Sequence, residues 1–165
     1  MLKITTYLFI IITFISFAAH ANSPLSGSGL PLPRFVSLRT NQVNLRTGPG
    51  TRYPIEWVFR QQGLPLEVTA EYDVWRRVRD WEGTEGWVHK STLSGQRYAI
   101  VKGEKSKELR ASKTLDAPVK ALLDPKTIGH ITACETNWCE VTFENVTGYL
   151  PKSAFWGAYR NEVFN

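Results

Sequence analysis

Short runs of alternating apolar and polar residues follow one another along the chain from residue 34 onward, and turn residues separate them. These runs predict β-strands at 34–39, 66–70, 75–79, 87–89 and 98–101. The segment 90–93 is too short for an α-helix and suits a single helical turn. No segment keeps an apolar period of about 3.6 residues, so the pattern predicts an all-β fold with very little helix.

The same pattern occurs twice, with matching residues 62 to 64 positions apart. Leu45-Arg46 matches Leu109-Arg110 at an offset of 64, and Trp75 matches Trp138 at an offset of 63. The triplet that begins at Gly86 has its partner 62 residues later. The offset falls by one residue twice, as expected when single deletions fall in loops. The sequence therefore predicts two copies of one small β-rich module.

The first 21 residues have the composition of a secretory signal peptide. Lys3 gives a short positive start, an apolar run from Tyr7 to Ala19 follows, and Ala21 provides a small residue before a cut ahead of Asn22. We therefore expect a periplasmic or secreted protein, with an uncleaved N-terminal anchor as the alternative. No later stretch is long enough to cross a bilayer, so we expect no stable membrane insertion.

The segment 22–33 is rich in Ser, Gly and Pro and carries no charge, which indicates a flexible linker or a disordered mature N-terminus. The two modules then span 34–95 and 98–160. Each module is near the lower size limit for a core of its own. Because the connection between them is so short, we expect the modules to pack together.

The formal net charge of +5 is spread along the chain, without a run of five basic residues. This mild bias fits attraction to anionic envelope polymers, and equally fits ordinary solubility. We expect no nucleic-acid partner. The chain contains 6 Trp, 6 Tyr and 8 Phe, a high share that small β-barrels often need to fill their cores.

Several motifs carry a resemblance to a known family. NLRTGPGTRYP at 44–54, VWRRVR at 74–79 and GTEGWVHKSTL at 83–93 resemble the bacterial SH3-like domain of exported and cell-wall-associated proteins. The second copy is similar in LRASKTLDAPV, CETNWCEV and GYLPKSAFWG. From Arg34 onward the chain resembles tandem SH3-like periplasmic proteins of alphaproteobacteria. The resemblance implies an all-β fold of two tandem small SH3-like β-barrels that bind cell-wall material, proteins or anionic polymers and are not themselves catalytic.

The turn Gly48-Pro49-Gly50 follows the first strand of the NLR motif, and its glycines permit backbone angles that other residues resist. The second copy has Ser112-Lys113-Thr114 at the matching positions. If this loop binds a ligand in the first copy, we expect the second copy to bind differently or not at all.

Aromatic and basic side chains of the first module are the candidate ligand-binding residues: Arg52, Tyr53, Trp75, Arg77 and Trp81. They would form an aromatic groove with a basic rim, suited to peptides bearing carboxylates or to amino-sugar polymers. The alternative is that the rings only fill the barrel and the junction between the modules. Trp81 lies in a turn and has no aromatic counterpart, so packing does not obviously require it. Trp87, inside a strand, is expected in the core.

Cys134 and Cys139 are the two cysteines of the chain. In the aligned hairpin they lie on adjacent strands across a four-residue loop, within disulfide distance. Export favours their oxidation. A nucleophilic Cys134 assisted by His130 is the functional alternative, but no hydrolase-like motif surrounds either cysteine. We therefore predict a structural disulfide.

No metal site, cofactor or enzymatic activity is expected. His89 and His130 lie on different modules, and the spacing of the cysteines does not suit zinc. Four acids near turns are expected to be solvated charges rather than a glycosidase pair: Glu67, Glu71, Glu82 and Glu85. We therefore expect a binding protein for peptidoglycan or its stem peptides. The second hypothesis is a protein–protein adaptor in the periplasm or at a host surface.

Overall fold

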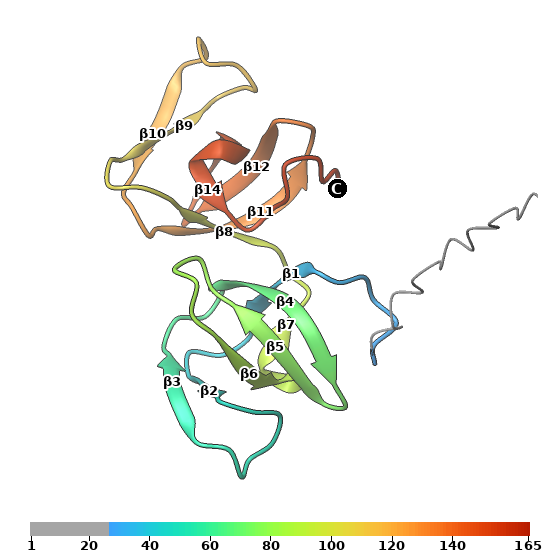
Figure 1. Ribbon diagram of the computed structural model, residues 1–165. Coiled ribbons are helices and arrows are strands. Elements are labelled where there is room, and N and C mark those ends of the chain that lie inside the picture. The colour runs from blue at the N-terminus through green and yellow to red at the C-terminus, as the bar shows by residue number, and fades with distance from the viewer. Residues whose placement is uncertain (1–26) are drawn as a thin grey trace, which may run out of the picture.

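The computed structural model describes residues 27–165. Its fold is all-β, with two seven-stranded sheets that each curl around a core of their own (Figure 1). This confirms the predicted fold class of two tandem small barrels. The predicted signal peptide, 1–21, lies outside the described residues. Within the described part of the chain, no helix is long and apolar enough to cross a membrane.

Both barrels have the same topology. The first contains β1 (Arg34–Leu38), β2 (Val43–Arg46), β3 (Ile55–Phe59), β4 (Pro65–Tyr72), β5 (Trp75–Arg79), β6 (Glu85–His89), the 3-10 turn η1 (Lys90–Thr92) and β7 (Leu93–Ser94). The second contains β8 (Tyr98–Val101), β9 (Lys107–Arg110), β10 (Val119–Leu123), β11 (Ile128–Cys134), β12 (Trp138–Phe143), β13 (Val146–Pro151), the 3-10 turn η2 (Lys152–Ala154) and β14 (Phe155–Trp156). The strand orders, β3-β2-β6-β5-β4-β1-β7 and β10-β9-β13-β12-β11-β8-β14, correspond strand for strand.

Strand alternation decides which side chains enter each core. Along β6, Gly86 and Val88 are buried while Trp87 is only half-buried and lies outside the core cluster. A Cβ atom at Gly86 would lie 2.6 Å from the Leu45 side chain, so this side of the strand faces the core. The next side chain points to the opposite face. The prediction of Trp87 as a core residue is therefore wrong.

The loop between β2 and β3 is shaped by the ring of Tyr53. A Cβ atom added to Gly48 would lie 2.5 Å from this ring, and one added to Gly50 would lie 3.4 Å from it. Neither glycine has a positive φ. The loop therefore needs a glycine at position 48 because the ring lies against its backbone, whereas a Cβ at Gly50 would make an ordinary contact. The special backbone angles that were predicted are found at neither glycine.

The two barrels meet in a continuous seam, as the short connection led us to expect. The ring of Phe35 in β1 lies 4.7 Å, edge-on, from the ring of Trp156 and 4.6 Å from that of Tyr159, measured between centroids. Ile100 of β8 belongs to the core cluster of the first barrel. The Tyr159 hydroxyl donates a hydrogen bond of 2.8 Å to Glu67. Burial, and then this hydrogen bond, raise the pKa of Tyr159 far above its usual value.

Arg97 fixes the C-terminal segment to this seam. Its guanidinium donates to both carboxylate oxygens of Glu162, at 2.5 and 2.9 Å, and to the carbonyl of Gly157 at 2.7 Å. It also lies 4.6 Å from the ring centroid of Phe164. Burial alone would raise the pKa of Glu162, but hydrogen bonds from Arg97 and from the Tyr159 backbone help to hold the pKa below its usual value.

The β4–β5 and β11–β12 hairpins are closed at equivalent positions by different chemistry. Cys134 and Cys139 face each other in the second barrel and form the predicted disulfide. The facing residues of the first barrel are Glu71 and Arg76, whose Oε1 and Nε atoms are 3.1 Å apart. An ion pair thus occupies the place of the covalent bond.

Glu71 also anchors the segment before β1. Its carboxylate accepts hydrogen bonds of 2.7 Å from the backbone N and the Oγ of Ser28, and it lies 2.5 Å from Arg34. Burial alone would raise the pKa of Glu71, but hydrogen bonds from Ser28 and Arg34 outweigh burial and hold the pKa below its usual value. The described part of the predicted linker, 27–33, therefore lies against the first barrel, and Leu32 packs on its core.

The substitution Glu71→Gln should lower the free energy of unfolding at pH 7 by about 3 kcal/mol, because it leaves two partly buried arginines without their charge partner. The folded pKa of Glu71 is depressed, so its contribution is present above about pH 4.3 and is lost as the pH falls through the folded pKa. Stability measured by denaturation should therefore fall more steeply in the wild type than in the variant below about pH 5. Glu104→Gln, at an exposed position, is the control. Parallel pH profiles for wild type and Glu71→Gln would contradict this role.

The substitution Gly48→Ala should lower the free energy of unfolding by about 1 to 3 kcal/mol, because the new methyl group overlaps the Tyr53 ring. In a Tyr53→Ala background the same change should cost much less. Chemical denaturation of the four proteins gives this double-mutant cycle. Equal losses in both backgrounds would show that the backbone, and not the ring, requires a glycine at this position.

Candidate functional site

A groove of about 350 Å³ opens on the first barrel beside the β2–β3 loop. Its lining residues are Gln42, Val43, Asn44, Arg46, Thr51, Trp75, His89 and Thr92. They include one tryptophan, two amides, a histidine and an arginine, and no carboxylate. The lining therefore offers a ring face together with hydrogen-bond donors of neutral or positive charge.

The register of β5 against β6 places the two rings of the groove, Trp75 and His89, side by side. Trp75 at the start of β5 pairs with His89 at the end of β6, and their ring centroids are 5.6 Å apart in an edge-on arrangement. The Nδ1 atom of His89 accepts a hydrogen bond from the backbone N of Ser91 at 3.3 Å. The Nδ1 atom also lies 2.7 Å from the Oγ of Ser91, and in the tautomer in which Nδ1 accepts both hydrogen bonds, Nε2 carries the proton and is a donor.

Arg46 places a positive charge at the rim and holds the loop beside the groove. Its Nη1 atom donates to the carbonyls of Tyr53 and Thr51, at 2.7 and 3.1 Å. Asn44 precedes it by two positions on β2 and therefore lies on the same face of the strand. Within residues 27–165 no hydrogen bond to the side-chain amide of Asn44 is found, so this amide is free to meet a ligand.

The second barrel repeats this groove at matching positions but in a smaller form. It measures about 100 Å³ and is lined by Lys107, Glu108, Arg110, Leu115, Trp138, Leu150, Pro151 and Ala154. Trp138 takes the place of Trp75, and Pro151 takes the place of His89. Arg110 forms an ion pair with Glu108. The tryptophan is kept, but Glu108 replaces Asn44, and Leu115, Pro151 and Ala154 replace Thr51, His89 and Thr92.

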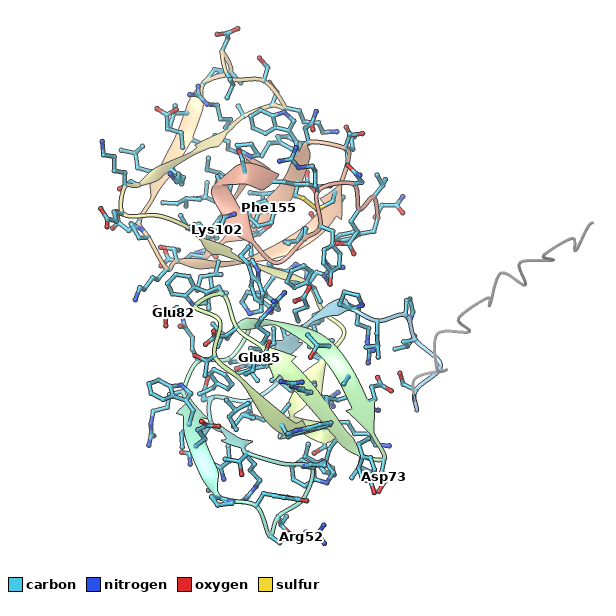
Figure 2. All side chains as sticks on the ribbon, viewed as in Figure 1. Arg52, Asp73, Glu82, Glu85, Lys102 and Phe155 are labelled. Carbon is cyan, nitrogen blue, oxygen red and sulfur yellow. A yellow bond between two sulfur atoms is a disulfide. The ribbon has the colours of Figure 1, made fainter. Side chains whose placement is uncertain are left out.

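The five predicted binding residues do not all meet at the groove. Trp75 lines it, and Arg52 and Tyr53 belong to the loop beside it, at the end of the first barrel that points away from the second (Figure 2). Arg77 lies on the outer face opposite Trp87 and pairs with Glu85 at 2.7 Å.

Trp81 lies at the other end of the first barrel. It packs against the core cluster, and the Nζ atom of Lys126 in the second barrel lies 5.1 Å from its ring centroid. Its neighbour Glu82 faces the second barrel in Figure 2. Trp81 therefore lies in the seam and not in the groove, which agrees for this residue with the alternative that the rings fill the barrel and the junction between the modules.

The groove residues that sequence reasoning missed are Asn44, Arg46 and His89. The alternation along β2 indicates the outward position of Asn44 and Arg46, because Val43 and Leu45 are its apolar, inward-facing residues. His89 was considered only as a metal ligand. Its place opposite Trp75 depends on the register of β5 against β6.

The acids near turns are not all solvated. Glu67 is buried, with Arg79 and the Tyr159 hydroxyl as its partners, and the side chain of Glu71 is buried between two arginines. The expectation of solvated charges is therefore wrong for these two and holds for Glu82 and Glu85, which are exposed. In the described part of the chain, no group of three or more His, Cys, Asp or Glu side chains is placed to hold a metal ion.

Solved structures of NlpC2 and NlpC1 from Trichomonas vaginalis are similar over 76% and 79% of this chain. Sequence identity is 10% and 12%, and the TM-score is 0.35 in both comparisons. The chain covers 48% of each structure, so it spans about half of their length. A TM-score this low carries no conclusion about fold or function. No curated protein matches this chain.

A family match agrees with the repeat and with the shared topology. The bacterial SH3 domain matches residues 39–95 and again residues 106–157. The first match runs from the end of β1 through β7, and the second runs from the start of β9 through β14. Together the two matches cover more than half of the chain. The chain therefore belongs to the bacterial SH3 domain family and carries two copies of the domain.

Proposed function

We propose that this chain is an exported, non-catalytic protein that binds peptidoglycan, with the stem peptides as its ligand, through the tryptophan groove of the first barrel. The family supports this proposal, since bacterial SH3 domains typically occur in exported proteins and often bind peptidoglycan. Export to the periplasm or the outside rests on the predicted signal peptide, 1–21. The tandem periplasmic proteins of alphaproteobacteria are the type of relative that the sequence resembles.

The observation that carries the proposal is the difference between the two grooves. Both barrels keep the tryptophan, but only the groove of the first barrel combines about 350 Å³ of space with His89 and an unpaired Asn44 amide. Packing within a barrel does not require these polar groups at its surface. They are what a ligand with carbonyl and carboxylate groups needs for recognition.

The electrostatics of the groove favour an acidic peptide. None of its lining residues is a carboxylate, and Arg46 stands at the rim. A stem peptide would place its carboxylates near this rim and an aliphatic portion against the Trp75 ring.

A purely binding role is supported by the bonding of the cysteines and of two buried glutamates, the side chains that could otherwise serve in catalysis. Cys134 and Cys139 are bonded to each other, which leaves neither as a thiolate nucleophile. Glu67 and Glu71 are each paired with arginines. Hydrogen bonds from Ser28 and Arg34 outweigh burial and hold the pKa of Glu71 below its usual value, so this carboxylate does not suit a general acid.

A protein–protein adaptor in the periplasm or at a host surface is the second candidate, and the edge strand β3 favours it. Ile55 and Trp57 on this strand are 48% and 54% exposed, and β3 ends its sheet. An extended segment of a partner protein could add to such an edge. This role would be indicated by pull-down of one stoichiometric protein that is lost with Trp57→Ala and unchanged by sugar-peptide fragments.

Trp75→Ala should weaken binding to purified peptidoglycan at least about tenfold, because a ring that anchors a ligand is worth more than about 1.4 kcal/mol. Co-sedimentation of the mature protein at physiological salt measures this. Trp138→Ala is the matched control in the smaller groove and should change binding little. Each variant should keep the circular dichroism spectrum of the wild type.

Two outcomes distinguish an error in the proposed ligand from an error in the proposed binding site. If the wild-type protein stays in the supernatant, the proposal of peptidoglycan binding fails. If it sediments and Trp75→Ala sediments equally well, the ligand class stands and the groove is not where it binds.

A further inference from the structure

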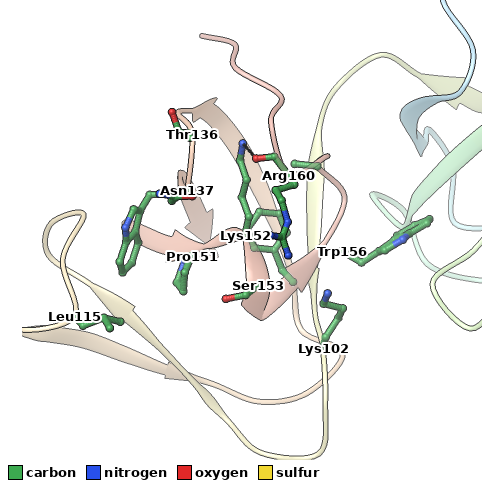
Figure 3. Close-up of a pocket in the computed structure, with 12 residues that line it drawn as sticks. Lys102, Leu115, Thr136, Asn137, Pro151, Lys152, Ser153, Trp156 and Arg160 are labelled. Carbon is green, nitrogen blue, oxygen red and sulfur yellow. Dashed lines mark hydrogen bonds between the residues drawn. The ribbon is translucent and has the colours of Figure 1, made fainter.

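The second barrel has a larger pocket, which adjoins its small groove and shares Leu115, Trp138 and Pro151 with it. It measures about 610 Å³ and lies between the β11–β12 turn, η2, β14 and the C-terminal segment (Figure 3). Trp138, Phe155 and Trp156 give it an apolar lining, with Leu115 at one end and Trp156 at the other in Figure 3. This volume lies in the usual range of about 300 to 1,000 Å³ for small-ligand sites.

Three cationic side chains line this pocket, and no acidic side chain does. They are Lys102, Lys152 and Arg160, and none of them takes part in any ion pair of residues 27–165. Lys152 is more than nine-tenths buried, and its Nζ atom donates only to the backbone carbonyls of Arg160 and Glu162. The nearby carboxylate of Glu162 is already engaged by Arg97. Positive charge therefore gathers here without a carboxylate to balance it.

The first barrel shows that the scaffold does not require this arrangement. Arg39 occupies the position of Lys102, since the backbone N of each donates to the equivalent carbonyl, that of Thr92 or Ala154. The guanidinium of Arg39 is used within the barrel, where its Nε atom donates to the carbonyl of Leu93 at 3.1 Å. No such bond is made by Lys102 among the described residues.

The C-terminal segment creates the difference. Residues after Trp156 fold back beside η2, where Lys152 holds them through two carbonyls, and this places Arg160 at the pocket. The equivalent point of the first barrel leads instead into β8. Over the equivalent η1 and β7 the first barrel has a pocket of about 520 Å³, but its three arginines are all in ion pairs. Three cations without an ion-pair partner therefore distinguish the pocket of the second copy.

We propose that this pocket binds a small anionic ligand in which a carboxylate or phosphate group adjoins a ring or a short apolar chain. The anionic group lies between Lys102 and Arg160, with Lys152 behind them, and the apolar portion packs against Trp138 and Trp156. Charge complementarity selects the anion, because transfer into a partly enclosed site favours a group that balances the unpaired cations. The site is separate from the groove of the first barrel and does not depend on peptidoglycan binding.

Titration with three fragments, followed by chemical-shift mapping on the mature protein, tests the proposal. Phenyl phosphate and phenylacetate carry a ring and an anion, and benzyl alcohol carries the ring alone. Both anions should bind with dissociation constants of about 1 to 10 mM, as expected for ligands of this size, and should shift the indole signals of Trp138 and Trp156. Benzyl alcohol should bind at least about fivefold more weakly. The stronger of the two anions identifies the preferred head group.

The double variant Lys102→Gln/Arg160→Gln should weaken binding of the better anion at least about fivefold. Arg60→Gln/Lys105→Gln removes the same two charge types from exposed positions outside the pocket and should leave the affinity unchanged. The proposal is overturned if benzyl alcohol binds as well as the anions, if the shifts map to the first barrel, or if both double variants behave alike.

Discussion

The packing of Phe35 against Trp156 and Tyr159 joins the first strand of one barrel to the last residues of the other. Strand β1 is buried on both sides, because Val36 and Leu38 enter the core of their own barrel while Phe35 enters the seam. A small barrel alone would leave this apolar surface in water and would lose the stabilisation that its burial gives. The two barrels therefore form one folded unit, in which the groove of the first barrel and the pocket of the second keep a fixed position relative to each other.

The two copies have the same strand order, and they differ at positions where either residue type is compatible with the barrel. The hairpin position that holds Glu71 and Arg76 in one copy holds a disulfide in the other, and both arrangements close the same turn. The tryptophan at the start of β5 and β12 is kept, while Asn44 and His89 beside it in the first barrel are replaced by Glu108 and Pro151 in the second. The second copy has a pocket lined by three cations that take part in no ion pair of the described residues. The two barrels thus share a fold and differ in the side chains that line their groove and pocket.

Local patterns in the sequence were enough to predict five of the fourteen strands of the described residues directly, together with the repeat and the disulfide. These features depend on neighbours along the chain and on the match between copies. The edge strand β3 was missed, because Ile55 and Trp57 are both exposed and give no clear alternation. The positions of Trp81 and Trp87 depend on contacts between strands and between barrels, which one sequence does not reveal. The pocket of the second barrel depends on the path of residues 157–165, which lie outside the repeat.

Residual dipolar couplings of backbone amides in both barrels test most directly whether the seam makes one unit of the two copies. One alignment tensor should fit all couplings from residues 34–95 and 98–156, since Phe35, Trp156 and Tyr159 hold the barrels in a single orientation. Two tensors of different magnitude, one for each barrel, would show that the copies move independently and would contradict this account of the seam.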